Sequence, residues 1–167
     1  MTKGFRVQGK ANFRGHPLHL MLISFPVALW TAALFTDSVG TWRHDDFWFR
    51  MSVVLIAMGT AVAVPASVCG YVDYRTVPMK RAARHLASAH LWWSLGATAL
   101  FALTLIVRAN ARHSPWGIVL TIVGDGVLLV GGYLGSELAN RYHIGIADAP
   151  AAEPRHAAAA PTRAGRR

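Results

Sequence analysis

Four histidines stand where polar stretches of the chain give way to apolar ones. His16 and His19 stand at the start of the first apolar run, in "GHPLHL", and His85 and His90 at the start of the third, in "RHLASAH". An imidazole can ligate a metal, carry a proton or form a hydrogen bond near neutral pH. Their positions therefore raise the question of a shared site.

Helical spacing decides which of these rings can meet. At 3.6 residues per turn, His16 and His19 lie about 60° apart, whereas His85 and His90 lie about 140° apart, so only one of the second pair can face a given point. Pairing His19 with His90 would place one imidazole on each of two helices. A four-helix bundle can hold a b-type haem in this way, with His16 and His85 as substitute ligands.

Charged residues near the same positions offer supporting groups. Arg14, Arg84 and Arg141 could pair with haem propionates, and Asp73 or Glu137 could orient the second nitrogen of a histidine. The same groups allow a non-haem metal held by two or three histidines with a carboxylate, or a proton or anion site. Histidines at such an edge can also be purely structural, hydrogen-bonded and interfacial.

Four long apolar runs must position these side chains. They span Leu18–Val39, Phe47–Val72, Leu86–Val107 and Trp116–Leu138. A helix needs about 20 residues to cross a bilayer, and none of the runs alternates as a barrel strand would. Glycines, Gly40 after the first run and Gly70 near the end of the second, suggest helix ends. The pattern predicts an all-α, up-down-up-down four-helix transmembrane bundle over residues 17–146.

The distribution of basic residues predicts orientation and argues against nucleic-acid binding. Thirteen Lys and Arg residues fall on the side of the two termini and the second loop, against four on the other side, among them Arg108. Cytoplasmic loops carry this excess, so both termini are expected in the cytoplasm, with the chain in the inner membrane. Although the net charge is +9, the sequence contains no stripe of basic residues interleaved with aromatic ones, which nucleic-acid binding would favour. A basic segment, residues 1–16, would precede the bundle, and a disordered Ala/Pro/Arg-rich tail, residues 147–167, would follow it.

Polar and small residues within the runs add further candidates. Asp125 lies near the middle of the fourth run, where an ionisable group is either functional or held neutral by a neighbouring helix. Asp37 is expected near the outer end of the first run, within reach of water. Gly131 and Gly135 form a G-x-x-x-G pattern that suits close helix packing inside the chain, or a homodimer through that face. Cys69 is the only cysteine, which excludes an iron–sulfur centre held by this chain.

Several of these segments together resemble a known family. "GHPLHLMLISFP" at 15–26, "GYVDY" at 70–74 and "GGYLGSELANRYHIGI" at 131–146 are similar to the domain of unknown function 2231 (DUF2231) family. The resemblance covers roughly residues 14–146 and implies a bacterial membrane protein of four helices. The family often has a histidine directly before "FP", where this chain has Ser24. Some members resemble fusions with Rieske-type iron–sulfur domains, which implies electron transfer.

These observations lead to one expected function and three alternatives. The expected protein is a small redox-linked membrane protein that binds haem b between the first and third helices and exchanges electrons with a partner protein. It would be an electron-transfer or accessory protein rather than an enzyme. The alternatives are a non-catalytic membrane subunit or scaffold with a structural polar layer, the non-haem metal or proton site described above, and an oligomeric channel or transporter.

Overall fold

A computed structural model describes residues 10–14, 16–142 and 144 of the chain. Its helices are α1 (Leu18–Arg43), α2 (Asp46–Thr76), α3 (Arg81–Asn110) and α4 (Pro115–Tyr142), preceded by a small antiparallel ribbon of β1 (Asn12–Phe13) and β2 (His16–Pro17). Most of the predicted basic segment and the whole predicted tail lie outside the described residues.

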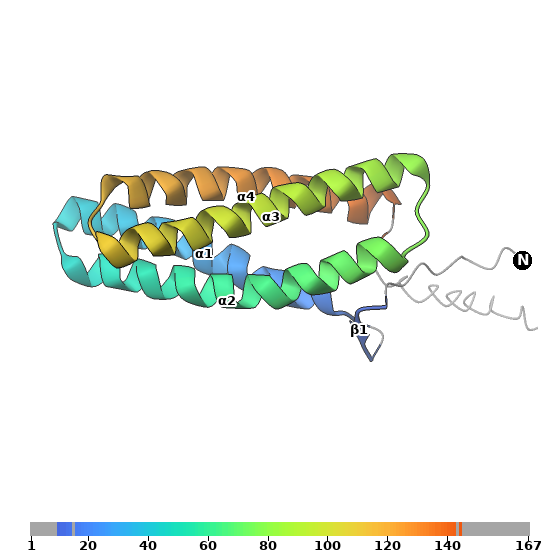
Figure 1. Cartoon of the computed structure of the whole chain (residues 1–167), viewed down its shortest axis with the longest axis horizontal. Coiled ribbons are helices and arrows are strands. Elements are labelled where there is room, and N and C mark those ends of the chain that lie inside the picture. Colours follow the sequence, from blue (N-terminus) through green and yellow to red (C-terminus); the bar gives the residue numbers. More distant parts are fainter. Residues whose placement is uncertain (1–9, 15, 143, 145–167) are drawn as a thin grey trace, which may run out of the picture.

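The predicted four-helix transmembrane fold is confirmed. Each of the four helices is long and apolar enough to cross a membrane. The helices run alternately up and down, side by side along one long axis (Figure 1). Large apolar side chains face outward, such as Phe35 at 65% exposed, because lipid rather than protein covers the outside of the bundle.

The helices extend beyond the apolar runs at nearly every end. Hydropathy marks only the residues that cross the hydrocarbon, whereas polar residues such as Arg81 and Arg141 continue the helices into the region where water is available. The expectation that Gly40 ends the first helix is wrong. Gly40 is buried inside α1, where a Cβ would lie 3.2 Å from the Phe49 ring, and the helix continues to Arg43, followed by His44 in the left-handed conformation.

The bundle consists of two helical hairpins. α1 packs closely on α2 and α3 closely on α4, while the contacts of α2 with α3 and of α1 with α4 are fewer. α1 and α3 are therefore diagonal across the bundle, and their inward side chains meet at its centre. The buried core is small and contains Trp30, Ile56 and Phe101 with three alanines.

The first and last described residues lie at the same end of the bundle as the α2–α3 loop (Figure 1). The Ala11 N–H donates a hydrogen bond to Asp73 Oδ1 at 3.1 Å, which ties the β1–β2 ribbon to the end of α2. An even number of crossings therefore brings the start of α1 and the end of α4 to one face, as the sequence predicted.

Candidate functional site

The structure brings His19 and His90 together at the centre of the bundle. Their ring centroids are 6.1 Å apart and the ring planes are inclined by 80°. His19 lies on the first turn of α1, and His90 lies nine residues into α3, on the diagonal helix. At 1.5 Å per residue, His90 is about 14 Å from the start of α3, so the start of α1 lies level with the interior of α3 and not with its first turn.

Each imidazole is fixed by a hydrogen bond to the backbone of the adjacent helix. His19 Nδ1 lies 2.8 Å from the Ala66 carbonyl oxygen on α2, and His90 Nδ1 lies 2.8 Å from the Gly131 carbonyl oxygen on α4. A carbonyl can only accept, so both Nδ1 atoms carry the proton. In the neutral rings, Nε2 is then the nitrogen with a free lone pair, which is the form that ligates metals.

Two glycines make room for the rings. A Cβ at Gly70 would lie 2.9 Å from His19 Nδ1, and a Cβ at Gly135 would lie 2.9 Å from His90 Cε1. Real Cβ atoms essentially never approach another atom so closely. Gly70, which the sequence suggested as a helix end, therefore lies within α2 and makes room for His19. Gly131 and Gly135 both face α3 of the same chain, which is the packing alternative of the two that the sequence left open.

A pocket of about 350 Å³ surrounds the histidine pair. All four helices contribute to its lining, which is mainly apolar and includes His19, His90, Trp30 and, toward the loop end, Asp73 and Tyr74. Ligand pockets are typically about 300–1,000 Å³ and combine an apolar lining with a few placed polar groups. This pocket has both properties.

The other residues predicted for the site lie around its edge or away from it. His16 and His85 are exposed and do not line the pocket, and the His16 ring is hydrogen-bonded to the Arg14 carbonyl. Glu137 is half-buried and also outside the lining. Asp73 lines the pocket but accepts the Ala11 N–H. The carbonyls of α2 and α4, rather than Asp73 or Glu137, hold the histidine Nδ1 atoms.

Two of the predicted arginines lie near the same end of the pocket. The Arg84 guanidinium carbon lies 5.4 Å from the centroid of the Tyr74 ring, and Tyr74 lines the pocket. Arg141 stacks in the same way on Tyr142, at 5.7 Å. Both arginines are exposed, so their charges are available to an acidic group at this rim. Arg14, over Phe13 at 5.5 Å, belongs to the β1–β2 ribbon.

The site shows an internal two-fold repeat that the sequence analysis missed. His19 and His90 are 71 positions apart, and their carbonyl partners, Ala66 and Gly131, are 65 positions apart. The two glycines behind the rings are also 65 positions apart. Each hairpin therefore builds the same unit. The available signal was the pair "HLMLISFPVAL" and "HLWWSLGATAL" at 19 and 90, in which four of eleven residues are identical.

The repeat continues toward the other end of the bundle. Eleven residues after the histidines, Trp30 and Phe101 stack with centroids 4.2 Å apart and planes within 11°. Gly59 and Gly124 lie behind these rings: a Cβ at Gly59 would lie 2.7 Å from the Trp30 ring, and a Cβ at Gly124 would lie 3.0 Å from the Phe101 ring. Trp30 also lines the pocket, so the stack lies next to it on the side away from the α2–α3 loop.

A buried ion pair forms the third level of the repeat. Asp37 and Arg108, again 71 positions apart, are bonded to each other, and both side chains are fully buried. Arg108 Nη2 also donates to Thr121 Oγ1 at 3.2 Å. The expectation that Asp37 reaches water is wrong, and Arg108 is not an interfacial charge. Sequence could not show this, because the two residues pair only when α1 and α3 are diagonal across one bundle.

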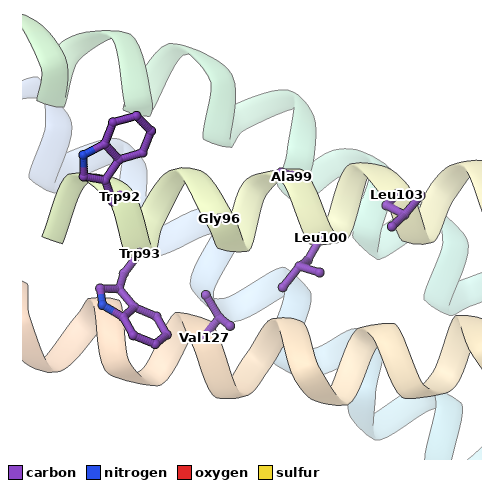
Figure 2. A pocket seen from close by; sticks show the side chains of 7 residues that line it. All are labelled: Trp92, Trp93, Gly96, Ala99, Leu100, Leu103 and Val127. Atoms are coloured by element: carbon purple, nitrogen blue, oxygen red, sulfur yellow. The ribbon is translucent and has the colours of Figure 1, made fainter. Parts of the chain in front are cut away.

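A second hollow on the molecule has no such polar groups. It is an open groove on the outside of α3, lined by Trp92, Trp93, Leu100 and Val127 among others. Figure 2 shows Trp93 reaching from α3 toward α4 beside Val127, with Trp92 on the other side of α3. Its lining is apolar and faces outward, as expected for a surface in contact with lipid chains.

The donor set limits what a ligand could be. Within residues 10–14, 16–142 and 144, no group of three or more His, Cys, Asp or Glu side chains is arranged to hold a metal ion. The two histidines alone could supply two nitrogen ligands, on opposite hairpins, inside an apolar pocket.

Comparison with known proteins identifies the family only. No curated protein and no solved structure matches the chain. The family model described as "Predicted membrane protein (DUF2231)" matches residues 15–148, which include all four helices, both histidines and their carbonyl partners. With most of its length matched, the chain belongs to the DUF2231 family of predicted membrane proteins.

Proposed function

We propose that this protein is a small membrane electron-transfer protein that binds one b-type haem between its two hairpins, with Nε2 of His19 and Nε2 of His90 as axial ligands. One observation carries the proposal. Two imidazoles lie 6.1 Å apart in an apolar pocket, and each donates Nδ1–H to a backbone carbonyl. A second hydrogen bond of this kind fixes the tautomer and orientation of metal-ligating histidines.

The number of protein ligands favours haem over a bare metal ion. Two histidines leave a zinc or iron ion short of its usual protein ligands, since structural sites use four and catalytic sites three. A porphyrin contributes four nitrogens and leaves two axial positions for the protein. Haem iron, once bound, accepts and releases one electron.

The chain's own residues would tune such a site in three ways. The carbonyls of Ala66 and Gly131 raise the basicity of the histidines. The apolar lining and the Trp30–Phe101 stack limit access of water, which affects the potential. Arg84 and Arg141, at the loop end of the bundle, could pair with the propionates.

The proposed orientation in the membrane follows from the distribution of basic residues. The end of the bundle with the α2–α3 loop carries most of the basic residues, so we place it in the cytoplasm and the protein in the inner membrane. A soluble or membrane redox partner would then exchange electrons across the cytoplasmic rim of the pocket.

A second candidate is a membrane scaffold subunit without a cofactor. The observation in its favour is that both histidines already have a hydrogen-bond partner, so their positions could serve helix packing alone. The haem-binding function and the scaffold function predict different absorption spectra after incubation with hemin.

The deciding experiment is spectroscopy of the full-length protein purified in detergent and incubated with hemin. Bis-histidine ligation should give sharp visible bands on reduction with dithionite and a low-spin signal in electron paramagnetic resonance. Saturation at one haem per chain is expected. If the spectrum keeps only the protein band and the broad absorption of free hemin, the haem function is wrong and the scaffold remains. Metal analysis of the same sample tests a non-haem ion.

A further inference from the structure

The buried polar groups near the Trp30–Phe101 stack, away from the histidines, have no role in holding the proposed haem. Asp125, on α4, is only 7% exposed, and neither carboxyl oxygen has a hydrogen-bond partner among the described residues. A carboxyl group in such surroundings is costly to keep, and its presence within a transmembrane helix points to a function.

The position of Asp125 connects the ion pair with the pocket. Thr121, one turn before it, binds Arg108, and Leu128 and Gly132, one and two turns after it, line the histidine pocket. Asp125 is six residues before Gly131, whose carbonyl holds His90, so the two levels are about 9 Å apart along the helix. Asp125 thus lies between the ion pair and the proposed haem.

The buried acidic groups at the level of Asp125 outnumber the buried basic ones. α4 packs against α3 and α1, and the charged groups that these helices bury here are Arg108 and Asp37. Arg108 is already bonded to Asp37, so these two helices supply one guanidinium for two buried carboxyl groups, and Asp125 is the one left without a bonded partner. An ionised Asp125 would be a buried charge without a bonded partner, which is strongly unfavourable unless another positive charge lies near.

A ferric haem would be that positive charge. Ferric iron in a porphyrin dianion has a net charge of +1 at its centre, and reduction removes it. We propose that Asp125 is a proton-binding group, and that it takes up one proton when the site accepts one electron. This inference rests on the proposed function, because it needs a redox centre in the histidine pocket.

The step is balanced in charge and atoms. When the proposed site accepts one electron from a one-electron reductant, one proton from water would form an O–H bond with the Asp125 carboxylate, and the net charge within the bundle would stay constant. On oxidation, the electron and the proton both leave. Arg108 Nε and Nη1 and Asp37 Oδ1 are buried without partners among the described residues, so internal water could bridge this level and carry the proton.

The test is a redox titration of the haem-loaded protein in detergent at several pH values. For a one-electron couple, a tenfold change in proton concentration corresponds to about 59 mV. The midpoint potential of the wild type should fall with a slope approaching this value as the pH rises through the titration range of Asp125. Asp125→Asn should give a flat profile with an unchanged haem spectrum. Should Asp125→Asn fold poorly, Asp125→Leu, which suits the membrane interior, replaces it.

A matched control comes from the repeat. Thr60 occupies on α2 the position that Asp125 occupies on α4, and Thr60→Val should leave the slope unchanged. A slope that persists in Asp125→Asn assigns the proton to another group, such as a propionate, and overturns the inference while the haem function stands. Absence of haem bands overturns the proposed function itself.

Infrared spectroscopy adds a measurement that needs no haem. In the haem-free protein Asp125 lacks the compensating charge, so a carboxylic acid C=O band that is absent from Asp125→Asn is expected. If no band distinguishes the two proteins, Asp125 does not hold a proton without the haem, and the proposed role of Asp125 as the proton-binding group is wrong.

Discussion

His19 on α1 and His90 on α3 are 71 positions apart in the chain, and their rings lie 6.1 Å apart at the centre of the bundle. Each ring donates its Nδ1 proton to a helix of its own hairpin, Ala66 on α2 for one and Gly131 on α4 for the other. The site is therefore shared equally by two similar halves, and a ligand between the rings would join them.

The two central histidines should be essential for haem binding, and the two exposed ones should not. His19→Ala and His90→Ala each remove one proposed ligand, so haem affinity should fall by more than about 100-fold. That is the largest loss usually seen when only a hydrogen-bond partner of a metal ligand is changed. His16→Ala and His85→Ala are the matched controls, because both rings are exposed. Titration with hemin, followed by absorbance, measures all four. A loss of binding in the controls alone would move the site to the helix ends.

The glycines behind the histidines should not tolerate a side chain. Gly70→Ala and Gly135→Ala place a methyl group within 2.9 Å of a ring, which must move away from its carbonyl partner. Overpacking of this kind costs about 1–3 kcal/mol, and haem affinity should fall as well. Gly126→Ala, where nothing lies within 4 Å, should be neutral. Thermal unfolding in detergent checks the three variants. Equal stability of all three would contradict the close contact.

The stack of Trp30 on Phe101 should contribute strongly to stability. Phe101→Ala leaves a cavity against Trp30 in the buried core and should cost about 3–5 kcal/mol. Phe35→Ala removes a similar side chain from the outer surface and should cost much less, because Phe35 faces lipid. A similar loss in the two variants would show that the stack is not the centre of the core. Unfolding midpoints in one detergent give the comparison.

The buried ion pair should be more sensitive to single changes than to replacement as a unit. Asp37→Asn or Arg108→Met leaves one buried charge without its partner, which costs about 3–5 kcal/mol. The double variant Asp37→Leu/Arg108→Met removes both charges and should recover most of that loss. Arg50→Ala, which breaks the exposed bond to Asp46, should change little. Additive losses in the double variant would argue against a direct pairing.

Much of the architecture could be predicted from sequence because hydropathy depends on composition alone. A run of about 20 apolar residues has few alternatives to a membrane-spanning helix, and an even number of such runs brings both ends of the chain to one face. Parity also indicated that His19 and His90 could meet. The helix ends were less accurate, since Gly40 lies within α1 and the polar ends of α3 and α4 continue the helices.

Only the tertiary structure decided which polar groups meet. The sequence favoured His19 and His90 but kept His16 and His85 as substitutes, and it left Asp73 and Glu137 unranked as partners, because these choices depend on how each helix is rotated. Rotation follows from packing, and here packing is set by small residues on α2 and α4 that admit the rings of α1 and α3. The carbonyls that hold the histidines carry no sequence signal at all, because every residue has one. The pairing of Asp37 with Arg108 likewise exists only because α1 and α3 lie diagonally across the bundle.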